Sequence, residues 1–137
     1  MEKKADFYKV AAENNVDVLF YPLPNAKSVS TEVYGQCYIG MDNSKSYTCA
    51  EEQVCLGHEL GHCLYGGFYS KSTPFDMIER HEVRADHWYI RRAIPKDVLL
   101  GLLREGHKPW EIAEELNTTE DYVSRAYYYY MDNEISG

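Results

Sequence analysis

The first forty positions of the chain alternate between polar and apolar residues in a way that predicts one helix and three strands. Apolar residues recur at helical spacing among the charges of the N-terminal segment. β-Branched and aromatic residues then fill three short runs, which Pro22 and Gly35 separate. The prediction is a short helix over residues 3–14, a strand over residues 16–21, and a hairpin of strands over residues 28–34 and 37–41.

Beyond residue 48 the apolar positions follow the period of α-helices. Thr48 and Glu51 fit a capping box and Gly66-Gly67 favours a helix end, so a helix of about five turns is expected between them. Residues 66–74 are expected to connect this helix to a second one, which ends near Arg92. Further helices are expected over residues 97–104 after Pro95, over residues 110–116 after Pro109, and beyond a cap at Thr118 or Thr119.

Together these elements predict an α+β protein that is mostly helical and has a small antiparallel sheet of about three strands. At 137 residues with 45% hydrophobic content, the chain is expected to form a single domain with its own core. Within it we distinguish a core of about residues 1–94 from a C-terminal helical segment, residues 95–137, packed on that core. The last two helices and the turn of residues 117–119 outline a helix-turn-helix.

Residues 58–62 read H-E-L-G-H, which is the pattern H-E-x-x-H inside the helix expected after residue 48. At about 100° per residue, His58 and His62 are about 40° apart on one helix face, so both rings can reach one cation. Glu59 lies at the edge of that face, where a carboxylate can take a proton from water. The pattern is typical of a zinc site in hydrolases.

Catalytic zinc takes three protein ligands and keeps a fourth position open, so a third donor is expected on another element. The charged segment of residues 79–88 offers Glu82 as the best candidate and Glu79 as its rival. If Glu82 binds the metal, Asp86 one turn later can accept the free N–H of a ligating histidine. The alternative is that these acids only solvate a charged helix face.

The two segments together resemble a known family of zinc enzymes. H-E-L-G-H followed by E-x-x-x-D resembles the gluzincin arrangement of zinc peptidases, and residues 82–95 resemble the E-x-x-A-N/D-x-F-A…L-x-P segment of the ImmA/IrrE metallo-endopeptidases. The likeness covers roughly residues 36–126, with Trp88-Tyr89 where the family usually has Phe-Ala. It implies a zincin-like fold and selects Glu82 as the third zinc ligand.

The resemblance also implies a function, namely a cytoplasmic zinc endopeptidase that cleaves a regulatory protein. Its substrate would be a helix-turn-helix DNA-binding repressor of a mobile element or stress operon. One Zn²⁺ is the expected cofactor because two histidines and a glutamate suit zinc, although manganese and iron stay open. Glu59 would transfer the proton, and the candidate donors for the developing oxyanion are Tyr65, Tyr69, His81 and His87.

The substrate cleft is expected between the motif helix and the small sheet. Peptides commonly add themselves to a strand edge in such clefts, and the strand over residues 36–41 is the expected edge. Phe68, Tyr69 and Ser70, in the connection between the two ligand helices, are expected to border the cleft.

Two other functions fit the same residues. A non-catalytic, zinc-stabilised module could bind a regulator and sequester it, and the helix-turn-helix outline suggests direct DNA binding. A net charge of −8 opposes attraction to phosphates, and Arg125 is the only cation of the last helix. We therefore expect a protein partner and no direct nucleic-acid contact. The run Tyr127–Tyr130 fits either a protein-binding surface or rings packed over neighbouring helices.

The compartment can be inferred from the N-terminus and the cysteines. The N-terminus has no apolar signal core, and no segment is long and apolar enough for a membrane span, so the chain is expected to be soluble and cytoplasmic. The cysteines show no C-x-x-C spacing, and Cys63 lies with Leu56 and Leu60 on an apolar stripe of the motif helix, directed away from the metal. We expect reduced, mostly buried thiols at Cys37, Cys49, Cys55 and Cys63.

Overall fold

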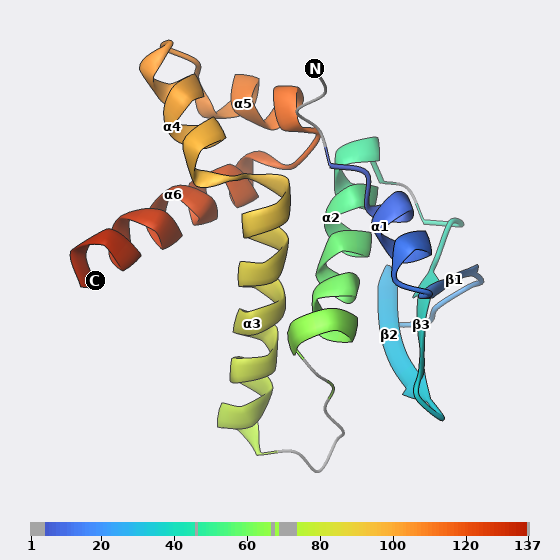
Figure 1. Ribbon diagram of the computed structural model, residues 1–137. Helices are drawn as coiled ribbons and strands as arrows, with labels where there is room; N and C mark the ends of the chain where they lie inside the picture. Colours follow the sequence, from blue (N-terminus) through green and yellow to red (C-terminus); the bar gives the residue numbers. More distant parts are fainter. Residues whose placement is uncertain (1–4, 46, 67, 69–73, 137) are drawn as a thin grey trace.

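The computed structural model describes residues 5–45, 47–66, 68 and 74–136, in which a small sheet packs beside one of two long antiparallel helices (Figure 1). The C-terminal helices lie at one end of that pair, and the α+β class is confirmed. The elements are α1 (Phe7–Glu13), β1 (Asp17–Phe20), β2 (Ser28–Val33), β3 (Gln36–Met41), α2 (Cys49–Gly61), the π-helical turn η1 (His62–Gly66), α3 (Phe75–Ala93), α4 (Lys96–Arg104), α5 (Pro109–Leu116) and α6 (Glu120–Ser136).

Helix α1 closes the core over α2 and α3. Its cap is Asp6, whose side chain accepts hydrogen bonds from the first backbone N–H groups of the helix. The N–H of Phe7 bonds to the side chain of Gln53 at 3.0 Å, and the Phe7 ring lies 5.9 Å from Trp88 and 5.3 Å from Tyr89. An aromatic cluster therefore joins the N-terminus to the helix pair.

The sheet is mixed, with β3 between β1 and β2. Strands β2 and β3 form the expected hairpin, in which Gly35 takes a φ of +80° that suits glycine. Strand β1 pairs in parallel with β3, with Val18 opposite Ile39. The prediction of an antiparallel sheet is therefore wrong, because residues 21–27 carry the chain to the far side of β3 instead of turning it back beside β1.

Strand β2 is an edge of this sheet, and β3 is its centre. The prediction that residues 36–41 offer an open edge is wrong, because β3 is paired on both sides. Along β2, side chains alternate between the two faces. Ser28 and Ser30 stand opposite the fully buried Met41 and Ile39, on the face that packs against α2. The edge strand thus presents two hydroxyls to the motif helix.

The loop before β2 is held by the buried side chain of Asp42. Its Oδ2 accepts a hydrogen bond from the N–H of Leu23 at 2.7 Å, and its Oδ1 accepts one from the N–H of Ser44 at 2.9 Å. The ammonium group of Lys45 lies 3.4 Å away. These hydrogen bonds, that of Leu23 foremost, lower the pKa of the Asp42 carboxyl.

We expect Asp42→Asn to lower the melting temperature at neutral pH, and to do so less in acid. The folded-state pKa lies below the unfolded value of about 3.9, so the carboxylate stabilises the fold above about pH 4 and loses this effect as the pH falls through the folded value. Thermal unfolding of both proteins from neutral to acidic pH should show the difference in melting temperature shrinking. A difference that stays constant would contradict the role of the ionised carboxylate.

Helix α2 continues into η1, and α3 packs along this rod in the opposite direction (Figure 1). The predicted capping box is confirmed. The hydroxyl of Thr48 accepts from the N–H of Glu51 at 3.1 Å, and the Glu51 carboxylate accepts from the N–H of Thr48 at 2.8 Å. Leu56 and Leu60, on the expected apolar stripe, are fully buried.

The C-terminal helices lie close to their predicted positions. Helix α4 begins directly after Pro95, and Pro109 is the first residue of α5. Thr119 caps α6, since its hydroxyl accepts from the N–H of Tyr122. The segment packs on the core through the hydroxyl groups of Tyr89 and Thr118, which lie 2.6 Å apart in the interior. Among the described residues, no helix has the length and apolar content required to cross a bilayer.

The run of four tyrosines in α6 divides between packing and surface. Tyr130 is buried and donates a hydrogen bond to the carbonyl oxygen of Ile94 at 2.7 Å. Tyr129 is half-buried and accepts one from Arg91 at 3.2 Å. Tyr127 and Tyr128 are exposed. The packing interpretation therefore holds for Tyr129 and Tyr130, and a protein-binding surface at Tyr127 and Tyr128 stays a prediction.

Cys37 of β3 and Cys63 of η1 form a disulfide, with their Cα atoms 6.1 Å apart. The expectation of four reduced thiols is therefore wrong. The two residues are 26 positions apart, and only the packing of the hairpin against the end of the α2 rod brings them together. Cys49 and Cys55 are free.

Candidate metal centre

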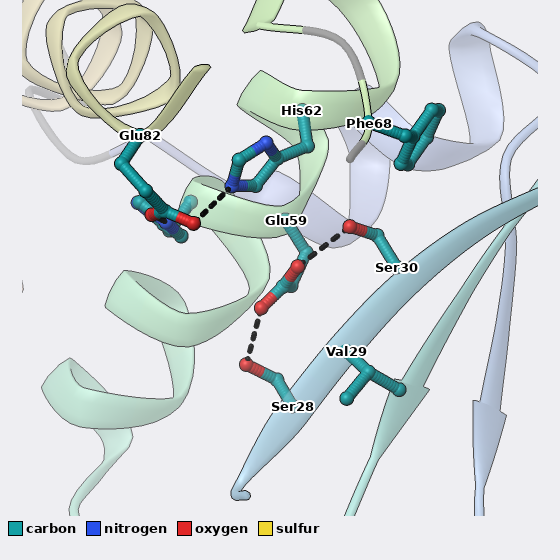
Figure 2. Close-up of a pocket in the computed structure, with 8 residues that line it drawn as sticks. Ser28, Val29, Ser30, Glu59, His62, Phe68 and Glu82 are labelled. Carbon is teal, nitrogen blue, oxygen red and sulfur yellow. Dashed lines mark hydrogen bonds and ion pairs between the residues drawn. The ribbon is translucent and has the colours of Figure 1, made fainter. Parts of the chain in front are cut away.

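The side chains of His58, His62 and Glu82 converge between α2 and α3. One ligand atom of each lies within 4.8 Å of the others, so that the group could hold a metal ion. The Glu82 carboxylate lies 2.8 Å from Nε2 of His58 and 3.2 Å from Nε2 of His62. Figure 2 shows Glu82 reaching across from α3 to the imidazole of His62. The structure thus brings together the three predicted ligands.

Helical spacing explains the convergence. His58 and His62 are one turn apart, and their rings lie 4.9 Å apart and nearly perpendicular. Glu82 faces them from the antiparallel helix. The rival Glu79 is exposed and borders a shallow surface depression with neighbours from α3 alone. The geometry therefore favours Glu82 over Glu79, as the family resemblance implied.

The donor set fits zinc. Two imidazole nitrogens and one carboxylate oxygen form a common catalytic zinc set, in which one position stays open. The side chain of His62 is 6% exposed, that of His58 22% and that of Glu82 37%, so the group opens toward one side. That side is a pocket of about 230 Å³. Among the described residues, Nδ1 of His58 is buried without a hydrogen-bond partner, and a histidine that binds a metal through its other nitrogen usually donates this N–H to an acceptor.

Gly61 sets the close approach of α2 and α3 at this centre. A Cβ at this position would lie 2.6 Å from the carbonyl oxygen of Ala85 and 2.9 Å from its Cα. Those are backbone atoms of a packed helix, so the two helices would have to separate. Glu82 lies about one turn before Ala85, and its reach to both histidines depends on that separation.

We expect Gly61→Ala to destabilise the fold by about 1–3 kcal/mol through overpacking, and also to weaken zinc binding. Thermal unfolding of the metal-free protein and a zinc titration measure the two effects. Gly101→Ala in α4 is the matched control, because an added Cβ there meets no atom within 4 Å. Zinc affinity that stays unchanged in Gly61→Ala would show that the helix separation does not position Glu82.

Glu59 points from α2 toward the sheet, where β2 binds both of its carboxylate oxygens (Figure 2). The hydroxyl of Ser28 donates to Oε2 at 2.9 Å, and the hydroxyl of Ser30 donates to Oε1 at 2.7 Å. A carboxylate offers about four lone-pair sites, so each oxygen can still accept another hydrogen bond. The pocket is lined by the three candidate metal ligands and also by Glu59, residues 28–30 and Phe68.

Asp86 lies near His58 but does not bind it in this structure. Its Oδ1 is 3.8 Å from Nδ1 of His58, which is beyond hydrogen-bonding distance. The carboxylate instead accepts hydrogen bonds from α6. The hydroxyl of Tyr122 donates to Oδ1, and Arg125 donates to Oδ2 at 3.4 Å. The predicted hydrogen bond is therefore not formed in this structure, in which the contacts with α6 place Asp86 just beyond hydrogen-bonding distance of His58.

The described residues around the pocket include none of the predicted oxyanion donors. Tyr65 is exposed, and neither it nor His81 is among the residues that line the pocket. His87 lies against the ring of Tyr129, 4.2 Å away, and burial lowers its pKa. Tyr69 and Ser70 lie outside the described residues. Phe68 does border the pocket, as expected.

Four residues of the centre were not found from the sequence. Ser28 and Ser30 show only the two-residue alternation of a half-buried strand, which does not say what they face. In the sequence, Tyr122 is one member of an aromatic stripe, and Arg125 is an isolated cation on the same helix. Their roles depend on contacts between elements far apart in the chain.

No family model, no curated protein and no solved structure matches the chain. The chemistry of the centre therefore has to be argued from its own residues.

Proposed function

We propose that the protein is a zinc-dependent endopeptidase. The observation that carries this proposal is the convergence of two imidazoles and a carboxylate beside a pocket that also contains the Glu59 carboxylate. The motif and the resemblance to the ImmA/IrrE metallo-endopeptidases support it. By the same resemblance, the substrate is a cytoplasmic DNA-binding repressor, which is a proposal by analogy.

His58, His62 and Glu82 would hold the ion. When bound there, zinc would act as a Lewis acid that polarises a carbonyl group and lowers the pKa of a bound water toward neutrality. The Glu59 carboxylate accepts a proton from the attacking water and delivers it to the leaving amine nitrogen. Ser28 and Ser30 keep that carboxylate at the pocket wall while leaving acceptor positions free.

The substrate chain would bind along β2. This strand pairs with β3 on one side, and its other side is unpaired in the described part of the sheet. An extended peptide can add to such an edge through backbone hydrogen bonds. Because Ser28 and Ser30 connect β2 to Glu59, a peptide on this edge lies close to the proton-transfer group.

The structure offers little for the DNA-binding alternative. Arg125, the only cation of α6, pairs with Asp86 at 3.4 Å and with Asp121 at 2.9 Å. Its charge is thus matched within the protein and is poorly placed to neutralise a phosphate.

Cleavage of proteins from the source cell tests the proposal. Zinc-loaded protein is incubated with an extract of these proteins, and new N-termini are identified by mass spectrometry. We expect a small set of cleavages that EDTA abolishes and added zinc restores. Cleavage that survives chelation would assign the activity to another hydrolase. No cleavage by zinc-loaded protein would favour the sequestering module instead.

The proposed cytoplasmic location can be tested through the disulfide. Disulfides persist mainly in oxidising compartments, and cytosolic thiols are kept reduced. In a reducing cytoplasm the disulfide of the structure would be opened, so alkylation during cell lysis should then trap free thiols at Cys37 and Cys63. A fully oxidised pair would contradict this location.

A further inference from the structure

Nδ1 of His58 is a buried polar atom that has no hydrogen-bond partner in the described part of the chain. Its other ring nitrogen, Nε2, faces Glu82 at 2.8 Å and is the one directed at the metal centre. A histidine that binds a metal through one nitrogen carries its proton on the other, and usually donates it to a carboxylate or carbonyl. His58 therefore needs an acceptor on the side away from the metal.

Asp86 is placed to be that acceptor. Its Oδ1 lies 3.8 Å from Nδ1, so a small rotation of either side chain can bring the two atoms into hydrogen-bonding distance. Both oxygens of Asp86 already accept from α6, Oδ1 from the hydroxyl of Tyr122 and Oδ2 from Arg125. Each oxygen has a second lone pair, so Oδ1 can accept from Tyr122 and His58 together.

The two groups on α6 are themselves fixed in place. Tyr122 is 8% exposed, and its ring meets that of Tyr89 edge to face at 4.8 Å. The guanidinium of Arg125 lies over the Tyr122 ring, 4.6 Å from its centre, and Nε bonds to Asp121 at 2.9 Å. Side chains held in this way lose little freedom when they bind Asp86.

We propose that α6 is part of the metal centre, with Tyr122 and Arg125 as positioning residues that hold Asp86 for His58. The affinity of His58, His62 and Glu82 for zinc then depends on a helix that contributes no ligand. The inference rests on the metal site of the proposed function and does not depend on peptide hydrolysis. It joins the C-terminal helical segment to the chemistry of the core.

Zinc dissociation constants test the proposal, measured by competition with a chromophoric chelator. Asp86→Asn should weaken zinc binding about 10- to 100-fold, the usual effect of losing a group that orients a ligand. Tyr122→Phe removes one hydroxyl but leaves Asp86 in place, so it should weaken binding less, by about 3- to 10-fold. Arg125→Gln should act in the same direction. Tyr127→Phe, on an exposed ring of the same helix, should have no effect.

A double-mutant cycle distinguishes positioning from general damage. If Tyr122 acts through Asp86, Tyr122→Phe should cost nothing further in an Asp86→Ala background. Melting temperatures of the metal-free proteins show whether each variant folds. An equal loss of affinity in both backgrounds, or normal affinity in both Tyr122→Phe and Arg125→Gln, would overturn the inference. A wild-type protein that binds no zinc would instead overturn the proposed function.

Discussion

Glu59→Gln should abolish peptide cleavage while leaving zinc bound. General acid–base catalysis by a positioned side chain contributes about 10²- to 10⁴-fold, and the amide can neither accept the proton of the attacking water nor deliver it to the leaving nitrogen. Glutamine has nearly the shape of glutamate, and its oxygen can accept from one of the two serines while its NH2 group donates to the hydroxyl oxygen of the other. We therefore expect kcat to fall by at least about 10²-fold, with an unchanged zinc content.

The measurement combines cleavage of an identified target with metal analysis of the same preparation. Glu52→Gln is a matched control, since Glu52 lies on the same helix, where it accepts a hydrogen bond from Tyr8 away from the metal centre. It should retain activity. A Glu59→Gln protein that still inactivates its target without cleaving it would support the sequestering module and contradict the proposed catalysis.

The local part of the centre could be predicted from the sequence because it depends on one helix. The spacing of His58 and His62, the position of Glu59 and the capping box at Thr48 all follow from the period of an α-helix and from the chemistry of its N-terminus. The placement of Glu82 beside His58 and His62 depends on the direction of a second helix, which the helical period does not give. The family resemblance selected Glu82 over Glu79.

The parts that could not be predicted depend on how distant elements pair. Alternation along a strand shows which residues share a face but not which strand is the neighbour. The order β1–β3–β2 made β2 the edge strand and placed Ser28 and Ser30 on Glu59. The disulfide of Cys37 with Cys63 depends on the same packing of hairpin and rod.

The contact of α6 with Asp86 has the same origin. In the sequence, Tyr122 is one of several aromatic residues on a helix face, and Arg125 has an acidic residue one turn before it. Nothing in that pattern points to a residue 36 or 39 positions upstream. The contacts that hold Asp86 beside His58 are thus the ones that suggest a function for α6.

Replacing each of the two candidate ligands of α3 with alanine should have very different effects on zinc binding. Glu82→Ala removes a donor that lies 2.8 Å and 3.2 Å from the two histidines. Loss of an orienting group already costs about 10- to 100-fold in affinity, so we expect loss of a direct ligand to exceed about 100-fold. Glu79→Ala removes an exposed carboxylate on the surface of α3 and should leave zinc affinity unchanged.

Both variants should fold, which makes the comparison sharp. Glu82 is partly exposed and Glu79 is exposed, so neither change creates a core cavity, and alanine is the best helix former. The metal-free proteins should melt at similar temperatures, while added zinc should stabilise wild type and Glu79→Ala but not Glu82→Ala. If Glu79→Ala lost its zinc and Glu82→Ala kept it, the convergence of donors between α2 and α3 would not be the metal centre, and the peptidase proposal would lose its structural basis.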